Sequence, residues 1–158
     1  MTENSGITKN DLYAYLTRVG VRKGYDVISE FVLLLPKSKI RKLDLVWAER
    51  RGNRQGNQDA ENPDYWRLKA IFEIEGCNIR ALPSEFNRHA EAFKYIRAKY
   101  GKSVKRYVVL YTEAFDRRWA HNKITRAREV KERIRWGGRG VRVVDGNRIK
   151  SILRDPGK

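Results

Sequence analysis

The order in which the hydrophobic period changes along the chain constrains its fold more than any other feature. Apolar residues recur at helical spacing over 10–20 and again over 26–35, where Pro36 ends the second segment. In 41–49 and 66–75 the apolar and polar residues instead alternate, as they do in half-buried strands. The first half of the chain is therefore predicted to form two helices followed by two strands.

Helices and strands are expected in turn in the second half of the chain. Helical spacing predicts a helix over 84–100, and the continuous apolar run 107–111 is typical of a strand covered on both faces. A long helix over 116–136, a short strand over 141–144 and a short helix over 147–153 complete the pattern. Strands joined through helices imply at least one parallel pairing. We expect an α/β or mixed α+β fold, with a central mixed sheet flanked by helices.

Positive charge is concentrated in the second half of the chain. The chain carries 35 Lys and Arg against 19 Asp and Glu, a formal net charge of +16. Residues 1–75 hold 13 basic and 11 acidic residues, whereas 76–158 hold 22 and 8, so the two net charges are +2 and +14. A basic field of this size favours nucleic acid or an anionic surface as the partner. Acidic residues kept beside that field favour a spot that holds a cation.

Length and composition exclude several classes of protein. With 158 residues, 41% of them hydrophobic, we expect a single globular domain over 1–158. The single cysteine, Cys77, excludes an internal disulfide framework and a Cys-rich zinc site. No apolar run approaches the roughly 20 residues of a membrane span, and no signal-peptide pattern opens the chain. We therefore expect a cytoplasmic protein without membrane association.

Three carboxylates lie on the polar faces of the two predicted strands. Asp44 is on the polar face of 41–49, and Glu73 and Glu75 are on the polar face of 66–75. If the strands are neighbours, the three groups converge, and their mutual repulsion requires a cation. Oxygen ligands of this kind suit Mg²⁺ or Mn²⁺, which can polarise a phosphodiester. Any one of these acids alone is better explained as solvated surface. The opposite face of the second strand is apolar, with Trp66, Leu68, Ala70, Phe72 and Ile74.

These residues carry a family resemblance. The pair Leu-Asp at 43–44 and the run Phe-Glu-Ile-Glu at 72–75 resemble the motif of the PD-(D/E)XK nuclease superfamily, with E-x-E in place of E-x-K. The resemblance covers about 24–113 and implies a restriction-endonuclease-like core of order α-β-β-β-α-β. In that core, the Asp stands on one strand and the E-x-K on the next. Residues 114–158 would then form a basic C-terminal extension.

The resemblance also implies roles for individual residues. Asp44 and Glu73 would be ligands of Mg²⁺ or Mn²⁺. Glu75 stands where the family has its lysine, so it would either be a third ligand or orient the attacking water. A lysine from elsewhere is the alternative, and Lys69 shares the expected polar face of the same strand. Glu30, on the preceding predicted helix, matches an additional helical acid that Holliday-junction resolvases use.

Further candidates lie outside the motif. His89 and Lys94, on the helix expected over 84–100, can approach the carboxylates, although a surface position is the favoured interpretation for His89. The polar segment 50–64 either enters a groove of a duplex or is a disordered connection. The basic helix over 116–136 favours contacts with a phosphate backbone over a merely solvated charged face. Its basic residues are Arg117, Arg118, Lys123, Arg126, Arg128, Lys131, Arg133 and Arg135.

Together, these patterns predict a metal-dependent endonuclease that hydrolyses phosphodiester bonds, with double-stranded or branched DNA favoured over RNA. The alternative is a non-catalytic basic nucleic-acid-binding protein in which the carboxylates are structural. Response to Mg²⁺ separates the two, because a simple binder is indifferent to the metal. The resemblance further implies a homodimer, since cutting both strands of a duplex requires two sites.

Overall fold

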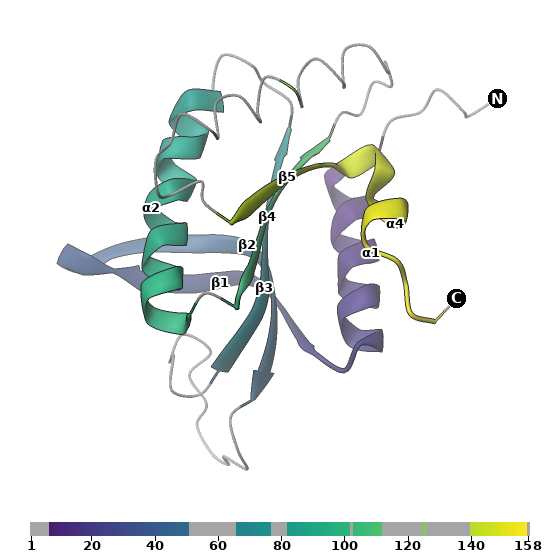
Figure 1. Ribbon diagram of the computed structural model, residues 1–158, viewed down its shortest axis with the longest axis horizontal. Helices are drawn as coiled ribbons and strands as arrows, with labels where there is room; N and C mark the ends of the chain where they lie inside the picture. The colour runs from purple at the N-terminus through teal and green to yellow at the C-terminus, as the bar shows by residue number, and fades with distance from the viewer. Residues whose placement is uncertain are drawn as a thin grey trace.

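A five-stranded mixed β-sheet in the order β1-β2-β3-β4-β5 forms the centre of the computed structural model (Figure 1). In the part of the chain that the structure describes, three α-helices accompany the sheet, so the predicted mixed α+β class is confirmed. The described residues are 7–50, 66–76, 82–101, 103–111, 125 and 140–157, and within 82–90 only the side chain of His89 is described.

Two helices cover opposite faces of the sheet, and each face has its own hydrophobic core (Figure 1). Helix α1 (Lys9–Arg22) begins after Thr8, which forms a capping box with Asp11. Helix α2 (Leu82–Tyr100) begins two residues earlier than the predicted 84–100 and ends where expected. The two buried stripes are Leu12, Leu16 and Val19 on α1 and Ala92, Phe93 and Ile96 on α2.

The segment predicted to be a second helix is a strand. Residues of β1 (Asp26–Leu35) pair antiparallel with β2 (Lys39–Arg50), and the short η1 turn that joins them begins at Pro36. Helical spacing required Leu34 to be buried, yet this side chain is 53% exposed. A short run rich in Val, Ile and Phe fits either period, and here the hydrogen bonds to β2 determine the conformation.

A β-bulge interrupts the pairing of β2 with β3 (Trp66–Gly76). The register shifts after Trp47, and Lys69 is the extra residue on β3. The prediction that 66–75 keeps one apolar face throughout is therefore wrong, because side chains before and after the bulge point to opposite faces. Trp66 and Leu68 belong to the core under α2, whereas Ala70, Phe72 and Ile74 belong to the core under α1.

The remaining strands extend the sheet in parallel. Strand β4 (Lys105–Tyr111) pairs parallel with β3, and β5 (Val141–Asp145) pairs parallel with β4, which confirms the predicted parallel pairing. After the η2 turn (Gly146–Arg148), the short helix α4 (Ile149–Ile152) lies on the same side of the sheet as α1 (Figure 1). Order and direction of the strands thus place the end of β3 in the middle of the sheet.

Several predictions fall on residues that the structure does not describe. The helix expected over 116–136 lies outside the described residues except for Thr125, and the polar segment lies outside them except for Arg50. The eight basic residues between 117 and 135 therefore remain a prediction. No helix in the described ranges is both long and apolar enough to cross a membrane.

Candidate functional site

The candidate site lies where strand β2 separates from β3. The pairing of the two strands stops at Leu45 and Phe72, while β3 continues beside β4 as far as Gly76. One residue beyond the last pair, the Oδ2 atom of Asp44 accepts a hydrogen bond of 2.7 Å from the backbone N–H of Ile74. The carboxylate of Asp44 thus accepts the hydrogen bond that a backbone carbonyl of a neighbouring strand would otherwise accept from Ile74. This bond holds Asp44 beside the carboxylates of β3.

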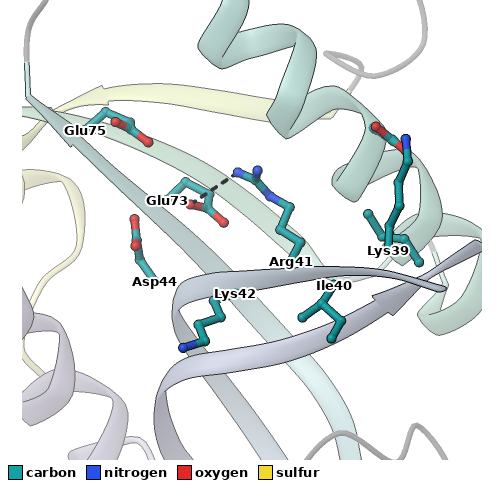
Figure 2. Close-up of a pocket in the computed structure, with 9 residues that line it drawn as sticks. Lys39, Ile40, Arg41, Lys42, Asp44, Glu73 and Glu75 are labelled. Atoms are coloured by element: carbon teal, nitrogen blue, oxygen red, sulfur yellow. Dashed lines mark ion pairs between the residues drawn. The ribbon is translucent and has the colours of Figure 1, made fainter.

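Glu73 and Glu75 join Asp44 in one pocket of about 510 Å³ (Figure 2). The three carboxylates expected to converge are therefore brought together. That expectation rested on the alternation of polar and apolar residues along β3. The alternation is interrupted at the bulge, but it is regular after Lys69, where Glu73 and Glu75 lie. The other residues that line the pocket are Leu35, Lys39, Ile40, Arg41, Lys42 and Glu91.

Glu73 is the most deeply buried of the three acids, with 2% of its surface exposed. Burial first, and then the negative charge of Asp44, raises the pKa of Glu73 well above its usual range. The guanidinium of Arg41 acts in the opposite direction and lowers it. The Oε1 atom of Glu73 has no hydrogen-bond partner among the residues that the structure describes. Without a divalent cation, this site therefore favours a protonated Glu73.

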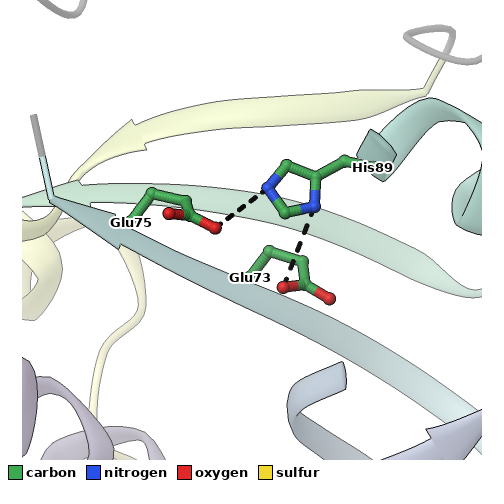
Figure 3. Close-up of side chains that lie close together, drawn as sticks. All are labelled: Glu73, Glu75 and His89. Carbon is green, nitrogen blue, oxygen red and sulfur yellow. Dashed lines mark ion pairs between the residues drawn. The ribbon is translucent and has the colours of Figure 1, made fainter. Parts of the chain in front are cut away.

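A histidine from α2 completes the cluster. His89 is 1% exposed, so its favoured interpretation as a surface residue is wrong. Its Nε2 atom lies 3.2 Å from Oε1 of Glu75, and its Nδ1 atom lies 3.8 Å from Oε2 of Glu73 (Figure 3). Ligand atoms of these three residues all lie within 4.8 Å of one another. Glu73 and His89 each have a buried atom without a hydrogen-bond partner among the described residues. Two carboxylates and an imidazole form a donor set that fits a divalent cation.

Arg41 supplies positive charge in the same place. Its Nη2 atom lies 3.8 Å from Oε2 of Glu73 (Figure 2) and 2.5 Å from Nδ1 of His89. Since a guanidinium only donates hydrogen bonds, Nδ1 of His89 must accept this one. The sequence offered a partial signal for Arg41, because it lies on the same strand as Asp44, but nothing in the sequence indicated its contact with α2.

Tyr13 reaches the carboxylates from α1. Burial first, and then the charge of Asp44 and a hydrogen bond with it, raises the pKa of the Tyr13 hydroxyl, and Glu73 and Glu30 add to the effect. The hydroxyl therefore remains protonated at neutral pH and can donate to Asp44. Sequence reasoning assigned Tyr13 to packing, because its helix position indicates a site only once α1 is known to lie against this part of the sheet.

Two predicted site residues lie elsewhere. Glu30 is on strand β1 rather than on a helix; it is exposed, has a φ of 53° and does not line the pocket. Lys69, at the bulge, has its Nζ atom 3.7 Å from Oε2 of Glu49 and does not line the pocket either. Because Lys69 is the extra residue of the bulge, its place in the alternation does not bring its amino group to the carboxylates. Lys94 is exposed on α2 and is also outside the pocket lining.

Two comparisons with known sequences were informative only in what they did not find. Neither a protein-family model nor a curated protein sequence matches this chain. A functional conclusion must therefore come from the chemistry of the pocket and from the arrangement of the elements that form it.

Proposed function

We propose that this protein is a metal-dependent endonuclease that hydrolyses phosphodiester bonds of nucleic acid, with DNA preferred over RNA. The observation that carries this proposal is the convergence of Asp44, Glu73 and Glu75 in one pocket. An acid as buried as Glu73, with an unpaired oxygen and two neighbouring carboxylates, is costly for a structural role. Such a cluster is consistent with a binding site for a divalent cation.

The arrangement of elements supports a restriction-endonuclease-like core. Chain order runs α1, β1, β2, β3, α2, β4, which is the α-β-β-β-α-β order that the PD-(D/E)XK resemblance implies. Asp44 lies on β2 and the Glu-Ile-Glu run lies on the adjacent β3. Both placements agree with the positions of the Asp and the E-x-K in that superfamily. The resemblance placed the first helix of this core at 26–35, which is strand β1 in the structure. Helix α1 precedes β1 and takes the first place in the order instead.

The carboxylates would act together on the cation. Asp44, Glu73 and Glu75 would hold Mg²⁺ or Mn²⁺, with Asp44 kept in place by the N–H of Ile74. When bound, the cation supplies Lewis-acid chemistry, since it polarises the phosphodiester and stabilises the leaving oxygen. Tyr13, as a neutral hydroxyl, would orient Asp44 from the other face of the sheet.

Cations on the pocket wall would attract the substrate. Lys39, Arg41 and Lys42 are consecutive or nearly so on β2, and all three line the pocket. They provide positive charge for a phosphate at the site, while Lys69 remains beside Glu49. The net charge of +16 over the whole chain favours the same polyanionic substrate.

A cleavage assay with a matched control tests this proposal. Supercoiled plasmid, linear duplex, a four-way junction and single-stranded RNA are incubated with the protein in Mg²⁺, Mn²⁺ or EDTA. We expect metal-dependent cleavage of DNA that Glu73→Gln abolishes without weakening DNA binding. Glu49→Gln is the control, because it removes an acid from β2 outside the pocket lining. Cleavage that persists in EDTA or in Glu73→Gln contradicts the proposal.

The same assay addresses the alternative of a non-catalytic nucleic-acid-binding protein. The net charge favours binding of this kind, although the burial of Glu73 has no role in it. Salt-sensitive binding that is unaffected by metal and by Glu73→Gln, with no cleavage of any substrate, would establish the binding protein instead. Sedimentation of the free protein and of its DNA complex tests the homodimer.

A further inference from the structure

We propose that His89 is a nitrogen ligand of the bound cation and that it gives the site a preference for Mn²⁺ over Mg²⁺. This inference rests on the proposed metal-dependent nuclease and names the cation on which it depends. The residues that carry it are Glu73, Glu75 and His89, whose ligand atoms lie within 4.8 Å of one another.

The burial of His89 points to a ligand role. The imidazole is 1% exposed, and its Nε2 atom has no hydrogen-bond partner among the described residues, although it lies 3.2 Å from Oε1 of Glu75. The buried Oε1 atom of Glu73 also has no such partner. Buried polar atoms are nearly always paired in folded proteins. A divalent cation held by Glu73, Glu75 and His89 would supply such a missing partner, and Figure 3 shows the His89 ring beside both glutamates.

The nitrogen ligand determines which cation binds best. Carboxylate oxygens suit Mg²⁺ and Mn²⁺ alike, but Mg²⁺ strongly prefers oxygen and loses its waters reluctantly. An imidazole therefore adds affinity for first-row transition ions and little for Mg²⁺. Mn²⁺ is the member of that series that also accepts a mainly carboxylate site. A site with Glu73, Glu75 and His89 should accordingly bind Mn²⁺ more tightly than Mg²⁺.

Arg41 lies against two of the three residues proposed as ligands. Its Nη2 atom is 2.5 Å from Nδ1 of His89 and 3.8 Å from Oε2 of Glu73. Because Nδ1 accepts a hydrogen bond from Arg41, a neutral imidazole carries its hydrogen on Nε2, beside Glu75. Metal binding at Nδ1 requires Arg41 to leave. Binding at Nε2 requires that hydrogen to move to Nδ1, which then no longer accepts a hydrogen bond from Arg41. Binding at either nitrogen therefore breaks the contact with Arg41, and removal of Arg41 should strengthen Mn²⁺ binding.

Direct metal binding by the full chain, without nucleic acid, tests this inference. We expect electron paramagnetic resonance of the bound Mn²⁺ to show coupling to a ¹⁴N nucleus, and we expect His89→Gln to remove that coupling. The substitution should weaken Mn²⁺ binding at least about 10-fold, because even second-shell partners of metal ligands contribute that much. Mg²⁺ affinity should change little. His121→Gln is the matched control, since it removes the other histidine of the chain.

A second variant protects the test against loss of folding. Arg41→Gln keeps a hydrogen-bond donor on β2 and should strengthen Mn²⁺ binding several-fold. Absence of ¹⁴N coupling in the wild-type protein, or an unchanged ratio of Mn²⁺ to Mg²⁺ affinity in folded His89→Gln, overturns the inference. Coupling that His121→Gln removes, while His89→Gln retains it, overturns it as well.

Failure of this inference is distinguishable from failure of the proposed function. If Mn²⁺ binds through His89 but no nucleic acid is cleaved, the metal site stands and the nuclease does not. If DNA is cleaved and Glu73→Gln abolishes cleavage, yet no ¹⁴N coupling is found, the nuclease stands and His89 is not a ligand.

Discussion

Replacement of Glu73 by Gln should change how the stability of the metal-free protein depends on pH. Burial and the charge of Asp44 raise the pKa of Glu73 in the folded state well above 4.5, the usual value that it has in the unfolded chain. Between these two pKa values, the folded state holds a proton that the unfolded state has lost. The stabilising contribution of Glu73 is therefore complete below pH 4.5 and is lost as the pH rises through the folded-state pKa.

The magnitude follows from linkage. One proton of difference between the two states lowers the free energy of unfolding by about 1.4 kcal/mol for each pH unit within that window. Glutamine does not titrate, so this dependence is absent from Glu73→Gln. Relative to the wild type, the variant should gain about 1.4 kcal/mol per pH unit, beginning near pH 4.5 and levelling off above the folded-state pKa.

Urea unfolding in EDTA at several pH values between 5 and 8 measures this difference. Subtraction of the two free energies of unfolding cancels the titration of groups that the substitution does not affect. Glu49→Gln is the control, because Glu49 lies outside the pocket lining and pairs with Lys69 instead. Parallel curves for the wild type and Glu73→Gln would refute the raised pKa, and with it the coupling of Glu73 to Asp44.

Three further predictions concern the metal, the C-terminus and the packing of α1. Mn²⁺ at 100 times its dissociation constant should raise the free energy of unfolding of the wild type by about 2.7 kcal/mol and that of Glu73→Gln far less, as thermal unfolding can measure. A hydrogen bond from Arg22 holds the pKa of Asp155 at about 2, so the contribution of Asp155 to stability is complete above its unfolded-state pKa and is lost as the pH falls through about 2. Asp155→Asn should remove this acid dependence, and equal acid unfolding curves for the variant and the wild type would contradict it. Gly20→Ala should destabilise the fold by about 1–3 kcal/mol, because the added Cβ would clash with the Trp47 ring; an unchanged urea midpoint would contradict this.

Local hydrophobic patterns were sufficient for most of the secondary structure. The strands expected at 41–49, 66–75, 107–111 and 141–144 all exist, each with ends close to the predicted ones. In these segments, the side-chain period agrees with the contacts that the folded chain makes. The segment 26–35 is the exception, because its apolar residues satisfy two periods and only pairing with β2 selects one.

The candidate site divides in the same way. Parity along two strands was enough to bring Asp44, Glu73 and Glu75 together in a prediction, since those strands are neighbours. The same rule was not enough to place Lys69, because Lys69 is the extra residue of a bulge and its amino group lies beside Glu49, outside the pocket lining. No sequence pattern signals that shift in advance.

The sequence by itself therefore determined strands β2 to β5, helices α1 and α2 and the acidic character of the site, because these depend on neighbours along the chain. Only the tertiary structure decided which other groups meet those acids. Arg41 comes from β2, His89 from α2 and Tyr13 from α1, and they converge because two helices pack on opposite faces of one sheet. Their convergence depends on where each helix packs across the sheet. The packing of the two hydrophobic cores sets those positions, and no local spacing in the sequence does so.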